Sequence, residues 1–139
     1  MDSYFFLSMN PPTVTHQEKD IAVIKGKPVV YEPAELKAAR AKLEAHLAKH
    51  KPDAPATGPV RLMVKWCFPL KGKHRDGEWK TSKPDTDNLQ KLLKDCMTHL
   101  GFWKDDAQVV SELIEKFWAK VPGIAIYVEE MEAVGWHDT

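Results

Sequence analysis

One short stretch of this chain constrains its fold more than any other, because its apolar residues recur at the spacing of a helix face. Between Asn88 and Gly101 they fall at positions i, i+3, i+4, i+7, i+8 and i+11, occupied by Leu89, Leu92, Leu93, Cys96, Met97 and Leu100. That spacing gathers all six on one side of a helix, and this side has to be buried against other elements. Asp87 is the expected N-cap, with Gln90 three residues later, and Gly101 is expected to end the helix.

The rest of the chain supplies elements against which that helix can pack. Val60 to Phe68 alternates apolar and polar residues, as a half-buried strand does, and Tyr4 to Leu7 indicates a shorter strand. Pro33 suits the first turn of a second helix that ends near His50. This helix would bury one apolar stripe, made of Leu36, Leu43 and Leu47. Ile21 to Tyr31 is open between a small hairpin and a loop.

The segment from Val109 to Trp118 has two interpretations. Its apolar pairs repeat every four residues, which favours a helix on periodicity alone. Val121-Pro122-Gly123, followed by the strand-like Ile124 to Val128, favours instead a hairpin whose second strand ends near Met131. A chain of 139 residues with 43% apolar content forms one compact domain. Strands separated by helices predict an α/β or α+β domain, residues 1–139, with one sheet.

Charge argues for local rather than global binding of nucleic acid. Twenty basic and twenty acidic side chains cancel, whereas a typical DNA-binding domain is basic overall. The stretch from Lys71 to Lys83, however, holds five Lys or Arg residues against two acids. No apolar run approaches the roughly 20 residues that cross a bilayer, so no membrane contact is expected. Cys67 and Cys96 lack metal-ligand spacing, and a reduced cytoplasmic location is the simplest expectation.

Acidic residues flank the predicted helix on both sides. Asp85 and Asp87 precede its first turn, and Asp105 and Asp106 follow its end. Hard divalent cations such as Mg²⁺ are bound by carboxylate oxygens. If the second pair folds back toward the first, the four carboxylates would repel one another unless a cation lay between them. The sequence therefore predicts an acidic metal site.

Other roles for these residues have to be weighed. An aspartate before a helix is often only a cap, and Asp105-Asp106 also suits a turn. A calcium-binding EF-hand loop is excluded, because Leu89 and Gln90 stand where that loop needs an oxygen ligand and a glycine. The Asp-x-Asp motif also occurs in nucleotide-sugar transferases, which are generally far longer. His46 and His50 have the i, i+4 spacing of zinc ligands but no third ligand nearby.

The fixed positions around these aspartates resemble the RusA family of Holliday junction resolvases, endonucleases of bacteria and their phages. The matching residues are Lys83, Pro84, Asp85, Asp87, Asn88, Leu89, Lys91, Asp95, Trp103, Asp105, Asp106, Gln108 and Val109. The similarity is strong from Lys83 to Lys116. It is weaker over Val60 to Pro69 and the final strands, and faint before them.

The resemblance implies a fold, an activity and a set of site residues. Family members are small homodimers of α/β fold that cut four-way DNA junctions with Mg²⁺, for which Mn²⁺ can substitute, in recombination and repair. A mixed sheet of about four strands packed with two main helices is implied, with Gln108 to Trp118 as a strand. The family's essential aspartates correspond to Asp85, Asp87 and Asp106, and its catalytic lysine to Lys91. Asp105 and Asp95 match acidic family positions, of which Asp105 is a less certain metal ligand.

The basic stretch before the acidic motif is the candidate DNA-binding surface. Its cations are Lys71, Lys73, Arg75, Lys80 and Lys83, with His74 nearby, and Trp79 is available to stack on an unpaired base. Such a stretch is also what a solvated loop contains, just as Lys91 lies where a solvated helix lysine is expected. Two other functions stay open: a different metal-dependent nuclease selective for flap or branched DNA, and a non-catalytic DNA-binding protein on the same scaffold.

Overall fold

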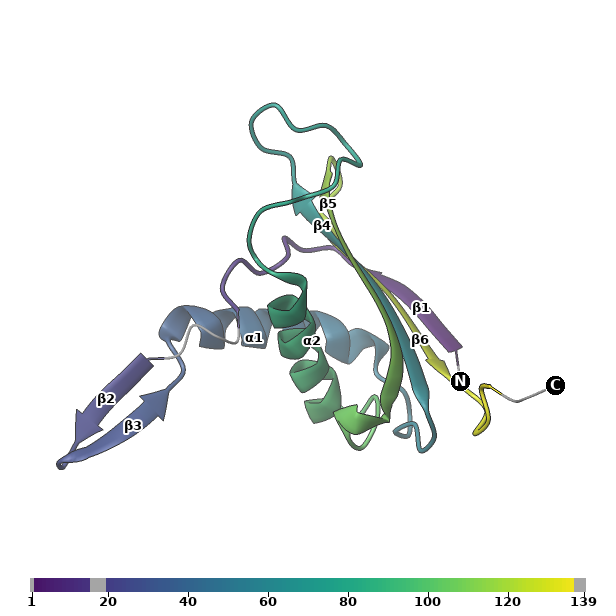
Figure 1. Ribbon diagram of the computed structural model, residues 1–139, viewed down its shortest axis with the longest axis horizontal. Coiled ribbons are helices and arrows are strands. Elements are labelled where there is room, and N and C mark those ends of the chain that lie inside the picture. The colour runs from purple at the N-terminus through teal and green to yellow at the C-terminus, as the bar shows by residue number, and fades with distance from the viewer. Residues whose placement is uncertain (1, 16–19, 137–139) are drawn as a thin grey trace.

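A four-stranded sheet with two helices on one face forms the body of the molecule (Figure 1). The structure is a computed structural model, and it describes residues 2–15 and 20–136. The sheet order is β1-β6-β4-β5. Its strands are β1 (Asp2–Leu7), β4 (Val60–Pro69), β5 (Val109–Ala119) and β6 (Gly123–Glu130). The helices are α1 (Ala34–Leu47) and α2 (Thr86–His99). The expected α+β domain with a mixed sheet and two main helices is confirmed.

The order of the strands corrects one expectation. Residues 109–119 form a strand, as the family resemblance implied, and the helical alternative is wrong. However, β5 and β6 do not form a hairpin, because β4 lies between them. β4 pairs with β5 in parallel and with β6 antiparallel. The chain therefore leaves β4, returns through α2 to start β5 at the same end as β4, and then crosses to the other side of β4 to form β6.

The stripe that dominates the sequence is the buried face of α2. Leu89, Leu92, Leu93, Cys96 and Met97 are fully buried. Gly101, with φ of 84°, takes the left-handed conformation that ends the helix, as expected. The expected start is wrong by two residues. The N-cap is Asp85 rather than Asp87, and no side chain makes a capping hydrogen bond there, so the pairing of Asp87 with Gln90 does not form.

The interior strand β4 contributes alternate residues to the core. Its inward residues, from Val60 to Phe68 at every second position, are buried beneath the helices, while the alternate residues point to the other face. α1 begins after Pro33 and buries the stripe of Leu36, Leu43 and Leu47, as expected. Short 3-10 turns extend α1 (η1, Ala48–His50) and precede β5 (η2, Asp106–Gln108).

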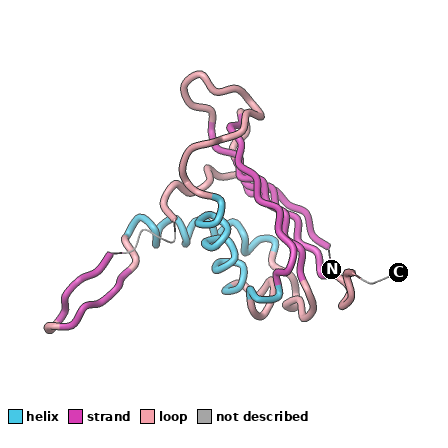
Figure 2. Tube along the Cα trace, viewed as in Figure 1, coloured by secondary structure: helices cyan, strands magenta, loops and turns pink. Residues whose placement is uncertain are grey.

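Two regions lie outside this layered body. β2 (Asp20–Ile24) and β3 (Lys27–Tyr31) form the small hairpin that the sequence left open, and it extends away from the sheet and helices (Figures 1 and 2). The long connection between β4 and α2 rises beyond the end of the sheet (Figure 2). The second face of the sheet carries exposed apolar side chains, among them Tyr4 at 73% exposure and Leu113 at 40%. Among the described residues, no helix is long and apolar enough to cross a membrane.

A glycine at the start of β6 provides a test of how tightly the sheet is packed. Gly123 is buried, and an alanine Cβ there would overlap the ring of Phe6 and lie 2.6 Å from the main-chain oxygen of Leu7. Because backbone on β1 cannot move without breaking its pairing with β6, we expect Gly123→Ala to cost about 1–3 kcal/mol of unfolding free energy. Gly135→Ala is the control, since nothing lies within 4 Å of that Cβ. Urea unfolding of both variants checks this, and equal midpoints would contradict it.

Candidate active site

Three of the predicted catalytic side chains lie together at the N-terminal end of α2. Asp85 is the extended N-cap residue, Asp87 is in the first turn, and Lys91 follows one turn later on the same side. All three are exposed. Within the described part of the chain, neither carboxylate makes a side-chain hydrogen bond or an ion pair, and Asp85 does not use its side chain as a cap. Both carboxylates are thus available to a ligand, beside the positive end of a helix dipole.

The turn that presents Asp85 is held by a lysine from β5. Lys116 Nζ donates hydrogen bonds of 2.7 Å to the main-chain oxygens of Ser82 and of Pro84. These two carbonyls bracket the residue before the proline, and Pro84 itself is buried. The backbone immediately before the first aspartate is therefore fixed to the sheet, so that the start of α2 and the end of β5 keep one relative position.

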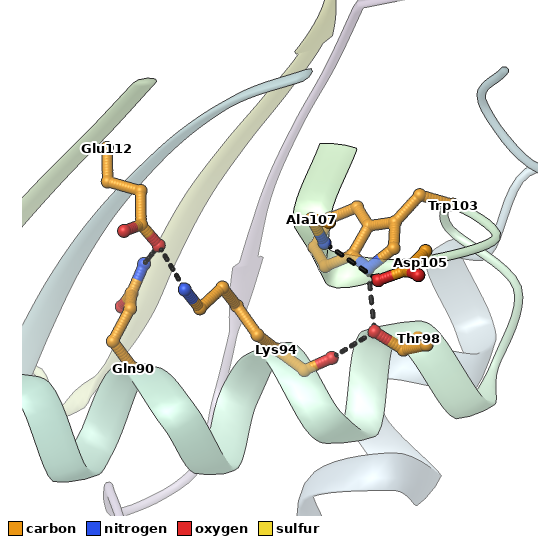
Figure 3. Close-up of polar contacts among 7 residues, drawn as sticks. All are labelled: Gln90, Lys94, Thr98, Trp103, Asp105, Ala107 and Glu112. Carbon is orange, nitrogen blue, oxygen red and sulfur yellow. Dashed lines mark hydrogen bonds and ion pairs between the residues drawn. The ribbon is translucent and has the colours of Figure 1, made fainter. Parts of the chain in front are cut away.

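The two residues of the second acidic pair differ in their contacts, and Figure 3 shows those of Asp105. Asp105 caps η2, where its Oδ1 accepts a 2.9 Å hydrogen bond from the amide of Ala107. Gln108 completes the capping box by accepting from the amide of Asp105, and its Nε2 donates to two carbonyls of the loop before β4. Asp105 is engaged in the turn that the sequence offered as its alternative. Asp106 is exposed and makes no side-chain contact of this kind within the described residues.

The two acidic pairs do not meet within one chain. Asp85 starts α2, whereas η2 lies beside the other end of that helix, where Trp103 donates to Thr98 (Figure 3). A helix of 14 residues is about 21 Å long at 1.5 Å per residue. Because β4 and β5 are parallel, the connection between them has to return to the end at which both strands begin, and α2 forms part of that return. The expected convergence of four carboxylates is therefore wrong for a single chain, and no three metal-binding side chains gather among the described residues.

The candidate DNA-binding residues occupy the connection between β4 and α2, but not equivalently. Lys71, Lys73, Arg75 and Lys83 are exposed, as a solvated or DNA-binding loop requires. Lys80 is buried, with only 8% exposure. Trp79 is 59% exposed and stacks on Phe117 at 4.5 Å, so part of its ring surface is still accessible. His74 stacks on Trp118 at 4.2 Å and is still exposed.

Two residues of structural importance to the site escaped sequence reasoning. Gln108 was identified only as part of the family pattern. It stands three residues after Asp105, which is the spacing of a capping box, so the sequence could have indicated this role. Lys116 gave no local signal, because its partners lie 32 and 34 residues away. Its role in holding the turn before Asp85 is visible only in the folded structure.

The donor set at the start of α2 fits a hard divalent cation. Two carboxylates, neither of them neutralised by a described basic side chain, supply the oxygen ligands that Mg²⁺ prefers, and such sites usually complete their shell with water and phosphate oxygens. A lysine one turn away adds a positive charge that a phosphate group can approach. The arrangement suits chemistry on a phosphodiester.

Comparison with known proteins gives a consistent result. The family model described as endodeoxyribonuclease RusA matches residues 10–129. The chain is 37% identical over 108 residues to the crossover junction endodeoxyribonuclease rusA of Lactococcus phage r1t, an alignment that covers 76% of this chain and 81% of that protein. It is also 32% identical over 123 residues to the uncharacterized protein YqaN of Bacillus subtilis (strain 168), covering 81% and 86% of the two chains.

Proposed function

Because the chain belongs to the RusA family of endodeoxyribonucleases, we propose that it resolves four-way DNA junctions by paired, magnesium-dependent hydrolysis of phosphodiester bonds in recombination and repair. The observation that carries the chemistry is the pair of unengaged carboxylates, Asp85 and Asp87, at the start of α2 beside Lys91. Mn²⁺ can replace Mg²⁺ in this proposal, since both accept oxygen ligands. Branched DNA is the substrate.

The side chains divide the work of hydrolysis. Asp85 and Asp87 hold the cation, with Asp106 as a further ligand. Asp105 is the weaker candidate ligand, because one of its oxygens caps η2. When bound there, Mg²⁺ would lower the pKa of an attacking water and offset the charge of the phosphate oxygens. Lys91 stabilises the negative charge that develops on the phosphate or on the leaving oxygen. Lys116 is a positioning residue, because it holds the carbonyls on either side of Lys83.

A complete site then needs two chains. Asp106 lies at the far end of α2 from Asp85 and Asp87, so it joins them only if another subunit supplies it. A four-way junction has near-symmetric strands, and paired cuts call for two sites related by a two-fold axis. We therefore propose a homodimer in which each site combines Asp85 and Asp87 of one subunit with Asp106 of the partner subunit.

The edge of the sheet supports this arrangement. β5 is an edge strand, and within the described chain its outer side is paired only near Phe117, through Trp79. The rest of that edge carries the exposed Val110, at 63%, and Leu113. An open edge is a template for pairing with another chain. Antiparallel pairing of β5 with its copy about a two-fold axis keeps both α2 helices on one face and points them in opposite directions. The start of α2 in one subunit then lies beside the end of α2 in the other.

Cleavage assays with three DNA substrates test the proposed function. Purified protein is incubated with a synthetic four-way junction, a flap and a linear duplex, each with Mg²⁺ and each with a chelator. We expect symmetric cuts in the junction that depend on the metal, because both the cation and the paired sites are required. Equal cutting of all three substrates would instead indicate a nuclease without junction selectivity. Binding of the junction without cutting under any metal would indicate a non-catalytic binding protein.

A further inference from the structure

Lys80 differs from every other cation of the connection between β4 and α2, because its side chain is buried. It is only 8% exposed, and its Nζ lies 4.3 Å from the ring of Trp118 and 5.1 Å from that of Phe68. Nζ donates one hydrogen bond, of 2.6 Å, to Ser82 Oγ. An ammonium group has three donors, so two are left unsatisfied by the described residues. The aromatic walls fix the position of the charge without neutralising it.

No carboxylate among the described residues pairs with this buried cation. Within the described part of the chain, Lys80 forms neither a hydrogen bond nor an ion pair with a carboxylate. Burial, and after it the positive charges of Lys116 and Lys71, lower the pKa of Lys80. A desolvated ammonium among other cations is an unfavourable arrangement, which an anion would relieve. The surroundings of Lys80 therefore favour the binding of an anion.

The space around Lys80 is large enough for a ligand. A cavity of about 730 Å³ opens there, lined on its apolar side by Phe68 and Trp118 and on its polar side by Asn10, Lys71, Lys80 and Lys83. Its volume lies within the range of small-ligand sites, roughly 300–1,000 Å³. Since Lys71 and Lys83 line the cavity and are exposed, an anion entering it would meet these two exposed cations before it reached the buried one.

The cavity also adjoins the candidate active site. Lys83 lines it and stands two residues before Asp85, which is a span of at most about 7 Å of extended chain. Ser82 connects the two sites directly, because its hydroxyl accepts from Lys80 and its carbonyl accepts from Lys116. A DNA strand whose scissile phosphate reaches Asp85 therefore has a neighbouring phosphate within reach of Lys80.

We propose that this cavity binds one backbone phosphate of the DNA strand, close to the phosphate that is cut, with Lys80 as its buried ligand and Lys71 and Lys83 closing over it. The proposal rests on the proposed function for the identity of the strand. The proposed ligand is a single phosphodiester anion, which the buried ammonium group of Lys80 binds. It separates Lys80, which is buried beneath the phosphate, from the exposed lysines of the connection, which would approach DNA from the solvent side.

A double-mutant cycle between protein and DNA tests the site. Neutral methylphosphonates replace single phosphates, one position at a time, in a four-way junction and in a linear duplex, and binding is measured with Ca²⁺ in place of Mg²⁺. The protein variants are Lys80→Met, which keeps the apolar packing, and Lys73→Met, the control from the same connection that does not line the cavity. Binding measurements need no cleavage, so they give a result whether or not the protein is a resolvase.

The expected result is one position of strong coupling. With wild-type protein, neutralising one phosphate beside the cut should weaken binding roughly tenfold, as loss of a charged hydrogen bond does. Lys80→Met should bind unmodified DNA roughly tenfold more weakly than wild type. The methylphosphonate at that one position should then weaken its binding no further. Lys73→Met should stay sensitive to the same methylphosphonate. Absence of such a position on both DNAs, including absence of any DNA binding, overturns the phosphate site. Coupling in the duplex without junction cleavage would retain the site and reject the resolvase.

Discussion

Asp87→Asn is expected to reduce the rate of junction cleavage by at least about a thousandfold, because a metal-dependent nuclease loses several kcal/mol of transition-state stabilisation when a metal ligand is removed. The substitution keeps the size of the side chain and removes the charge that attracts the cation. Asp87 makes no side-chain hydrogen bond or ion pair with the described residues, so the fold loses only its favourable interaction with the helix dipole, about 0.3–1 kcal/mol. Rates are measured under single-turnover conditions, and junction binding is measured in parallel.

The matched control for this variant is Asp105→Asn. Asp105 also belongs to the acidic motif, but its Oδ1 caps η2 by accepting from the amide of Ala107. An asparagine oxygen can make the same hydrogen bond, since asparagine is as good a cap as aspartate. We therefore expect cleavage by Asp105→Asn to stay within about tenfold of wild type, because the cap is kept and the proposed ligands Asp85, Asp87 and Asp106 are unchanged. Cleavage that survives Asp87→Asn intact would show that catalysis does not occur at the start of α2.

The helices and strands that could be predicted are those in which buried residues recur at a regular spacing along the sequence. The stripe of α2 and the alternation of β4 each bury one face, and the period of apolar residues reveals such a face without knowledge of its partner. The pairing of β5 was not readable in this way. Apart from Trp118, its residues are intermediate or exposed, so no buried face shows in the pattern. The four-residue repeat of its apolar pairs favoured a helix, and only the hairpin alternative and the family resemblance indicated a strand.

The candidate site shows the same limit. Asp85 and Asp87 both have the chemistry of an N-cap, and their spacing could not decide which of them begins the helix. The polar composition of the connection before α2 predicted exposure for all its lysines, whereas the rings of Phe68 and Trp118 bury Lys80. Both rings come from strands that are distant in sequence. The sequence identified which residues carry charge, and the topology decided where each charge lies.

Mixing two inactive chains should restore cleavage if each site is shared between subunits. Asp87→Asn and Asp106→Asn are expected to be inactive as homodimers. In their heterodimer, one site receives both substitutions, and the other combines an intact Asp87 with an intact Asp106. Random assortment makes about half of all dimers heterodimers, so the unseparated mixture has about a quarter of the wild-type sites and the purified heterodimer about half. Differently tagged chains are co-expressed, the heterodimer is purified, and its products should be nicked rather than doubly cut.

The converse mixture separates a shared site from a site within one chain. A chain that carries both substitutions is paired with a wild-type chain. If Asp106 acts across the dimer, each site contains one substituted residue, and this heterodimer should be inactive even though one of its chains is intact. If all three aspartates of a site came from one chain, this heterodimer would instead nick the junction, and the mixture of single variants would be inactive. Because α2, about 21 Å long, lies between Asp85 at its start and η2 beside its other end, we expect the first pattern.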